Sequence, residues 1–188
     1  CLRRDLNNLD LPIIYVQLGP FFRKAPSSIV ASYEKVREIQ RRIAHLRKDT
    51  YMISSIDLSL DDGIHLSFKS QQRLGRRLAE IALTKVYHIP GHGHPIDLTT
   101  GEVLQGQREL PMIRLRFSGV SGRLRAEGRP NGFELRSYET YADPLHMVYR
   151  MDFDPNDPSA VILGVWHPFK YDSDQLFYGG GLYPYVNI

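Results

Sequence analysis

The first 88 residues alternate strand and helix patterns, and this alternation restricts the fold more than any other feature of the chain. A nearly continuous apolar run, Ile13–Leu18, has the length of a strand and suits a sheet that is covered on both faces. A helical pattern follows over 32–48, a second strand pattern over 51–58, and a second helical pattern ends near Lys85. Strand–helix–strand–helix is typical of a parallel sheet with crossover helices.

The apolar stripes of the two helical patterns predict which faces pack against this sheet. The expected stripe of the first helix is Val36, Ile39, Ile43 and Leu46. Its basic side chains are expected to point mostly away from the sheet: Lys35, Arg37, Arg41 and Arg42. The expected stripe of the second helix is Leu74, Leu78 and Ile81, and Ser67 or Ser70 is the expected N-cap.

The pattern changes near Tyr87, after which prolines, glycines and histidines predict a linker over 89–110. From Pro111 onward the chain reads as short strands separated by turns, with candidates at 113–117, 132–137, 147–153 and 160–165. The sequence thus predicts an α/β segment over 1–88 and a β-rich segment over 111–188. We expect the second segment to be a truncated antiparallel sandwich or a sheet appended to the first segment.

Composition narrows the functional classes. The 188 residues contain 24 Lys+Arg and 21 Asp+Glu, and the two basic runs, 37–42 and 73–77, lack interleaved aromatic residues, so nucleic-acid binding is not expected. No apolar run reaches 18 residues, so a membrane span is not expected either. The single cysteine, Cys1, cannot form an internal disulfide. The apolar end at Tyr-Val-Asn-Ile leads us to expect a piece of a longer protein.

Asp62 and His65 are the strongest candidates for chemistry. They follow the second predicted strand, in the kind of loop where α/β proteins collect catalytic groups. A carboxylate three residues before a histidine can bond to its Nδ1 and leave Nε2 as a base, and Gly63 would allow the tight turn. The alternative is structural, because Asp61 or Asp62 could merely close an Asx-turn.

The longer stretch DDGIHLSFKSQQRLGRRLAEIAL resembles the Asp-x-x-His block of SGNH hydrolases, and most closely the carbohydrate-acetylesterase branch that includes sialate O-acetylesterases. The strand PIIYVQLGPF and the tail YGGGLYPYVNI are also similar to that branch. The resemblance implies the C-terminal part of a three-layer, flavodoxin-like α/β fold, followed by a β-rich part. It also implies that His65 is the general base, that Asp62 orients it, and that no cofactor or metal is needed.

The resemblance departs from the family at the nucleophile. The family's serine stands in a Gly-Asp-Ser-like block near the start of the domain, and no such block is present in this sequence. Ser121, in Gly-Val-Ser-Gly, is the nearest match and is expected to shape a turn instead. The chain alone is therefore expected to be inactive, and its expected partners are an acetylated sugar and a missing N-terminal segment or second chain that carries the serine.

Several alternatives remain open. The substrate could be acetylated sialic acid, acetylated xylan or another acetylated sugar, or the β-rich part could be a non-catalytic carbohydrate-binding or interaction module. A metal site at His88, His92 and His94 is weighed and disfavoured, because no carboxylate or cysteine stands at ligand spacing. The aromatic residues of the β-rich part could stack on sugars or form ordinary strand core: Tyr138, Tyr141, Tyr149, Trp166, Phe169, Tyr171, Phe177 and Tyr178. A secreted, periplasmic or lysosomal location is suggested by the resemblance alone.

Overall fold

The computed structural model describes residues 2–90, 95–104, 110–137, 148–166, 170 and 172–188. The chain forms two compact units. Unit 1 consists of Cys1–His94 together with Gly181–Tyr183, and unit 2 consists of Pro95–Gly180 together with Pro184–Ile188. Each unit is described by itself below.

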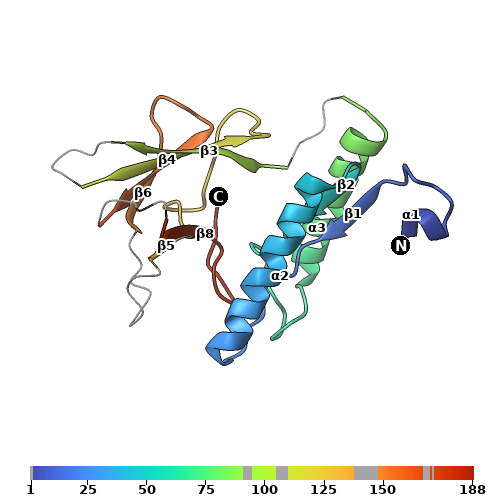
Figure 1. The fold of residues 1–188 in the computed structure, drawn as a ribbon, viewed down its shortest axis with the longest axis horizontal. Helices are drawn as coiled ribbons and strands as arrows, with labels where there is room; N and C mark the ends of the chain where they lie inside the picture. Colours follow the sequence, from blue (N-terminus) through green and yellow to red (C-terminus); the bar gives the residue numbers. More distant parts are fainter. Residues whose placement is uncertain (1, 91–94, 105–109, 138–147, 167–169, 171) are drawn as a thin grey trace. The chain divides into compact units, whose positions relative to one another are not determined.

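Unit 1 is built on two parallel strands with helices along them (Figure 1). Its elements in chain order are α1 (Leu2–Asp5), β1 (Ile13–Val16), α2 (Ser27–Leu46), β2 (Thr50–Ile53), α3 (Phe68–Ile81) and the π-helical turn η1 (Ala82–Val86). β1 pairs with β2 in parallel, with Ile13 opposite Thr50, which confirms the predicted strand–helix–strand crossover. Both α2 and α3 contact β2.

Both strands of unit 1 are shorter than predicted, because side chains replace strand partners at their carboxyl ends. The backbone N–H of Leu18 donates to the side chain of Gln40 at 2.8 Å rather than to a neighbouring strand. After β2, the hydroxyl groups of Ser54 and Ser55 donate to the side chain and the backbone carbonyl of Gln17, at 3.1 and 2.9 Å. Buried Gln17 thus joins the ends of the two strands.

The predicted orientation of α2 is wrong. Val36, Ile39 and Ile43 are 41–46% exposed, whereas Arg37 is only 5% exposed. The Arg37 guanidinium can be buried because it donates to four backbone carbonyls, those of Leu18, Gly19, Gly181 and Leu182, at 2.6–3.1 Å. Helical periodicity detects apolar stripes but cannot detect carbonyl groups that converge on one arginine from distant parts of the chain.

The predicted features of α3 agree better with the structure. Ser67 is the N-cap, since its Oγ accepts a hydrogen bond from the backbone N–H of Ser70 at 3.3 Å. Ile81 of the predicted stripe is buried, and Leu74 and Leu78 are partly buried. The α-helix ends at Ile81 and η1 extends it to Val86, close to the predicted end at Lys85.

Unit 2 is a β-structure with a core between two antiparallel sheets. Its strands are β3 (Asp97–Leu104), β4 (Met112–Ser118), β5 (Phe133–Ser137), β6 (Val148–Phe153), β7 (Ala160–Val165) and β8 (Asp174–Tyr178). One sheet has the order β3-β4-β7-β6 and the other pairs β5 with β8. Side chains of β4, β5 and β7 share one hydrophobic cluster: Ile113, Leu115, Phe133, Leu135, Val161, Leu163 and Val165, joined by Leu124.

Two strands of unit 2 were not predicted. β3 lies within the 89–110 segment that was expected to be a linker, and its side chains are exposed or only partly buried, so it lacks the alternation that reveals a half-buried strand. β8 is five residues long and carries only one buried residue, Asp174. The alternation of Ile113, Leu115 and Phe117 in β4 is as predicted, with the first two buried.

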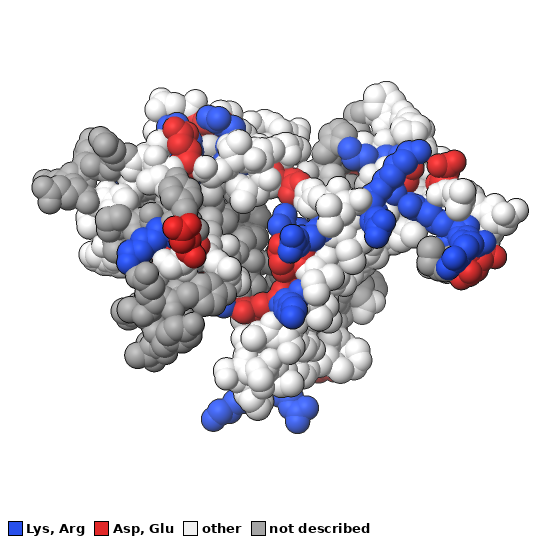
Figure 2. Space-filling model, viewed as in Figure 1, with Lys and Arg blue, Asp and Glu red and all other residues white. Residues whose placement is uncertain are grey.

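Charged side chains of both signs lie beside one another on the surface of each unit (Figure 2). Arg41 is paired with Glu38 in unit 1, for example, and Arg116 with Asp157 in unit 2. None of the helices in the described part of the chain combines the length and the apolar character that crossing a bilayer requires.

Candidate active site

The turn that carries Asp62 and His65 connects β2 to α3 and is closed by backbone hydrogen bonds. Leu60 and Leu66 form an isolated antiparallel bridge, and the backbone N–H of Asp61 donates to the carbonyl of His65 at 2.9 Å. One step further out, the N–H of Ser67 donates to the carbonyl of Ser59 at 2.9 Å. The turn is therefore a small closed loop at the N-terminus of α3.

The two carboxylate oxygens of Asp62 contact different groups. Oδ1 accepts hydrogen bonds from the backbone N–H groups of Ile64 and His65, both at 2.8 Å, as in an Asx-turn. Oδ2 lies 2.6 Å from Nδ1 of the His65 imidazole. The structural and the catalytic interpretations of this aspartate are thus not alternatives, because one side chain makes both sets of contacts.

The electrostatics of the pair suit a histidine that acts as a base. The hydrogen bond from His65, helped by the two backbone N–H groups, holds the pKa of Asp62 well below its usual range, so the carboxylate is ionised at neutral pH. An ionised Asp62 favours the tautomer with the proton on Nδ1, which leaves Nε2 with a free lone pair. The His65 side chain is 71% exposed, and its Nε2 makes no hydrogen bond to a described residue.

Glycine at position 63 is favoured by a close neighbour rather than by its own backbone angles. The structure does not place it at positive φ, as the tight-turn argument would suggest. Instead its carbonyl accepts a hydrogen bond from the N–H of Phe22 at 2.8 Å, and a Cβ at this position would lie 3.2 Å from the carbonyl oxygen of Phe22. The segment that follows β1 therefore supports the Asp62–His65 turn from one side.

Hydroxyl groups support the turn from its other side. Ser59 Oγ lies 2.8 Å from Ser67 Oγ and 3.0 Å from Ser70 Oγ, so the two ends of the turn and the first turn of α3 are joined. The side chain of Gln71 also donates to the carbonyl of Leu66 at 2.8 Å. The sequence did not predict that these residues support the turn together, because the SFKSQQ run indicates only the start of a helix.

A recess of about 490 Å³ lies next to the turn in unit 1. It is lined from the turn by Ile64 and Leu66, the residues on either side of His65, and from the segment that follows β1 by Gln17 and Pro20. A recess next to the turn is where a substrate or a further catalytic group could be accommodated.

The other candidate residues that the structure describes form no part of the Asp62–His65 turn. Ser121 lies in an exposed turn of unit 2 between Gly119 and Gly122, whose φ angles are 75° and 82°, as expected for a turn-forming serine. His88 is exposed, and His92 and His94 lie outside the described residues. Across the described part of the chain, His, Cys, Asp and Glu side chains form no group of three that could hold a metal ion.

The described aromatic residues of unit 2 pack largely on each other. The rings of Tyr149 and Trp166 lie 4.6 Å apart, and those of Phe133 and Tyr178 lie 4.7 Å apart. The Arg136 guanidinium lies 4.1 Å from the ring centroid of Phe177. The remaining four members of the set fall outside the described residues: Tyr138, Tyr141, Phe169 and Tyr171.

Comparison with known proteins gives a consistent result. Residues 1–84 match the family model described as "Carbohydrate esterase, sialic acid-specific acetylesterase". The structure resembles that of XAC1771, described as a novel carbohydrate acetylesterase from Xanthomonas citri, with a TM-score of 0.72 and 20% sequence identity. The match covers 98% of this chain but only 40% of that one. No curated protein sequence matches the chain significantly.

The structural likeness at this identity establishes a shared mixed α/β fold, and the family match lies on the part of the chain that contains the Asp62–His65 turn. The resemblance inferred from the Asp-Gly-x-His-Leu-Ser motif is thereby confirmed at the level of the family. Over residues 1–84, the chain is similar to the carbohydrate esterase family of sialic acid-specific acetylesterases.

Proposed function

We propose that this chain is the C-terminal portion of a serine esterase that removes O-acetyl groups from carbohydrate, with O-acetylated sialic acid as the substrate. The observation that carries the proposal is the Asp62 Oδ2–His65 Nδ1 contact of 2.6 Å in a turn that lies within the esterase-family segment. In this proposal unit 1 is the end of an SGNH-type three-layer sheet and unit 2 is its β-rich companion.

The proposed reaction proceeds in two steps. The serine hydroxyl attacks the acetyl carbonyl while its proton passes to Nε2 of His65, and the resulting imidazolium is stabilised by ionised Asp62. The imidazolium then returns the proton to the departing sugar oxygen, which leaves an acetyl-serine. A water molecule gives one proton to Nε2 while its oxygen attacks the acetyl carbonyl. The imidazolium then returns this proton to the serine oxygen as the acetyl–serine bond breaks, and acetic acid leaves and ionises to acetate. Backbone N–H groups and an asparagine outside this chain would hold the oxyanion, as the family resemblance implies.

The serine would come from an N-terminal segment of the same domain, or from a second chain that supplies it. Two features of unit 1 support this. The sheet has only two strands among the described residues, and a two-stranded sheet is marginally stable alone. The stripe of α2 made of Val36, Ile39 and Ile43 is exposed and offers an apolar face for that segment. The chain also spans 40% of the length of the structurally similar esterase.

A test of the reaction uses the full-length protein that contains this chain. We expect His65→Ala to lower kcat/KM for p-nitrophenyl acetate and for an O-acetylated sialoside by about 10³-fold or more, because the base is lost. We expect Asp62→Asn to lower it by about 10²–10⁴-fold, because the amide favours the wrong tautomer. His45→Ala, which removes an exposed histidine of α2, is the matched control.

Retention of esterase activity in a folded His65→Ala protein would overturn the catalytic proposal and favour a non-catalytic carbohydrate-binding or interaction module. A preference for acetylated xylan over the O-acetylated sialoside, with His65 still required, would keep the chemistry and change the substrate. Circular dichroism of each variant establishes that lost activity does not reflect unfolding.

A further inference from the structure

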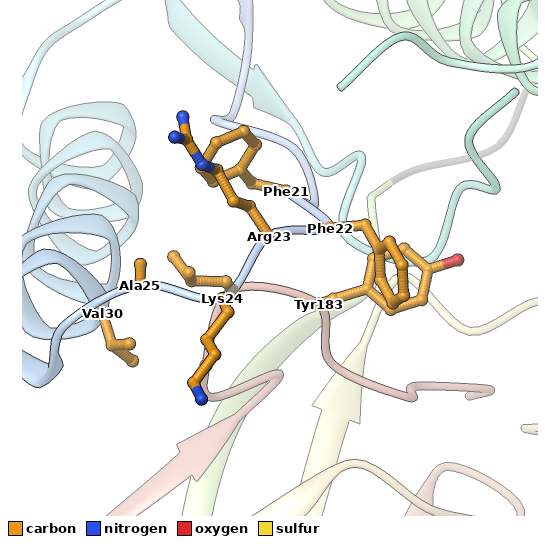
Figure 3. A pocket seen from close by; sticks show the side chains of 9 residues that line it. Phe21, Phe22, Arg23, Lys24, Ala25, Val30 and Tyr183 are labelled. Carbon is orange, nitrogen blue, oxygen red and sulfur yellow. The ribbon is translucent and has the colours of Figure 1, made fainter. Parts of the chain in front are cut away.

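Two exposed aromatic rings, those of Phe22 and Tyr183, lie together at a recess of unit 1 (Figure 3). The ring centroids of Phe22 and Tyr183 are 5.2 Å apart, and the rings meet edge to face at 72°. The two residues are 161 positions apart in the sequence. Phe22 is 68% exposed and Tyr183 is 50% exposed. Exposed aromatic faces that are fixed against each other favour the binding of a flat, partly apolar ligand surface, such as one face of a sugar ring.

The same recess carries positive charge. It has a volume of about 440 Å³, and Arg23 and Lys24 line it together with the two aromatic residues. Figure 3 shows their side chains extending to opposite sides of the backbone between Phe22 and Ala25. Both cations are exposed, and neither forms an ion pair with a described residue. A ligand that combines an apolar face with a carboxylate would complement this recess.

The recess is held in place by buried contacts rather than by its own exposed side chains. The segment Gly181–Tyr183 returns from the far end of the sequence to unit 1. The Arg37 guanidinium donates to its carbonyls at Gly181 and Leu182, and Glu34 accepts a hydrogen bond from the N–H of Gly181 at 2.6 Å. The N–H of Phe21 also donates to the carbonyl of Leu182 at 2.8 Å. Tyr183 is therefore presented by an anchored backbone.

The recess is connected to the catalytic turn through one hydrogen bond. The N–H of Phe22 donates to the carbonyl of Gly63, which lies between Asp62 and His65 in the turn. A sugar that rests on Phe22 would thus be bound by the same backbone segment that supports the imidazole. This is the arrangement expected when a ring is held in one place while a substituent on it reacts nearby.

We propose that Phe22 and Tyr183 form a platform for a sugar ring and that the positive charge of Arg23 and Lys24 favours a sugar that carries a carboxylate. The preferred substrate is then an O-acetylated acidic sugar rather than a neutral one. This inference rests on the proposed esterase function and assigns the residues that would select among its substrates.

The test compares two substrates in the full-length protein: the methyl glycoside of O-acetylated N-acetylneuraminic acid and the methyl ester of the same compound, which lacks the negative charge. Acetate release is measured for both. We expect wild-type kcat/KM to be about tenfold higher for the acid than for the ester, and the ratio to approach one in Arg23→Ala/Lys24→Ala. Lys35→Ala, an exposed lysine of α2, should keep the wild-type ratio.

The aromatic platform is tested with the same two compounds. We expect Phe22→Ala and Tyr183→Ala each to lower kcat/KM for both sugars by about three- to tenfold, mainly through KM, and to leave the acid-to-ester ratio unchanged. Tyr87→Ala removes another exposed aromatic side chain of unit 1 and should leave KM unchanged.

Two results would overturn the inference. One is an acid-to-ester ratio near one in the wild-type protein while His65 is still required for turnover of p-nitrophenyl acetate, which would leave the esterase proposal standing. The other is a loss of thermal stability in all these variants together with equal losses on both sugars and on p-nitrophenyl acetate. That result would mean that another segment of the protein covers Phe22 and Tyr183.

Discussion

Unit 2 encloses a hydrophobic core of its own, whereas unit 1 leaves much of its apolar surface open among the described residues. Leu135, Leu163 and Val165 of unit 2 are fully buried. Unit 1 buries fewer apolar side chains, chiefly around Leu58 and Ile81, while one whole stripe of α2 is exposed. The difference indicates that unit 2 is stabilised largely by its own side chains, whereas unit 1 leaves apolar surface that a further segment could cover.

The two units also differ in how they use buried polar groups. In unit 2, the nearly inaccessible carboxylate of Asp154 is balanced by Arg114, whose Nε lies 2.7 Å from its Oδ2. In unit 1, buried Arg37 donates to backbone carbonyls of segments that are distant in sequence, and buried Gln17 donates to the carbonyl of Arg37 and accepts from the hydroxyl groups of Ser54 and Ser55. Unit 1 therefore holds its loops, including those around the candidate site, by hydrogen bonds rather than by apolar packing.

The largest expected effect on stability comes from removing a side chain from the core of unit 2. We expect Leu163→Ala to lower the free energy of unfolding of unit 2 by about 3 kcal/mol, because the side chain is fully buried and a cavity would remain. Urea unfolding followed by circular dichroism measures the change. Leu98→Ala, at an exposed position of β3, is the control, and equal losses for the two variants would contradict the assigned core.

The next effect concerns the polar core of unit 1. We expect Arg37→Met to destabilise unit 1 by about 2–4 kcal/mol, since four carbonyls would lose the hydrogen bond from the guanidinium. Hydrogen exchange resolved by segment should show faster exchange around Phe21 and Leu182 while unit 2 keeps its protection. Arg42→Met, at an exposed position of α2, serves as control, and unaltered exchange in unit 1 would show that the arginine is not needed to hold the segment.

A smaller effect tests whether the exposed face of α2 is covered in the complete protein. In the 188-residue chain, Ile39→Ser should change stability by no more than about 0.5 kcal/mol, because the side chain is already 46% exposed. In the full-length protein it should cost about 1–2 kcal/mol. Gel filtration gives a second readout, because the wild-type chain alone should associate through this face. A stable, monodisperse 21.6 kDa monomer would contradict the expectation.

The smallest expected effect is a change in the pKa of Asp62 when His65 is replaced. The hydrogen bond from His65 lowers the pKa of Asp62, so we expect NMR of the Asp62 carboxyl carbon to show a higher pKa in His65→Ala than in the wild type. The pKa should stay below its usual value in the variant, because backbone N–H groups still donate to Oδ1. An identical pKa in the two proteins would show that the imidazole does not bind this carboxylate.

The sign of the resulting pH dependence follows from the depressed pKa. Ionised Asp62 stabilises the folded turn fully above the pKa that it has in the unfolded chain, and this contribution is lost as the pH falls through the lower folded value. Acidification should therefore loosen the turn only below the usual range of aspartate titration. Activity that is lost at a higher pH would have another cause.

Local sequence signals predicted the parts of the fold that depend on neighbouring residues. The parallel crossover, the Ser67 N-cap, the alternation in β4 and the spacing that lets Asp62 reach His65 all follow from short-range geometry. The catalytic role of the pair stays a prediction until the variants are measured.

Features that depend on distant segments could not be predicted in this way. The burial of Arg37 requires carbonyls from Leu18 and from Leu182, which no window of sequence brings together. The contact between Phe22 and Tyr183 could not be predicted either, because it forms only when the two distant segments come together in the fold. β3 was missed because its side chains face solvent too evenly to show a period of two.

The return of Gly181–Tyr183 to unit 1 has a consequence for how such a chain can be cut or recombined. Pro95–Gly180 lies between two segments of unit 1, and Pro184–Ile188 belongs to unit 2 again, so the chain passes from one unit to the other three times. Removing or exchanging unit 2 would take a junction at each of these three crossings. A truncation placed before Gly181 would remove part of the unit that carries the Asp62–His65 turn.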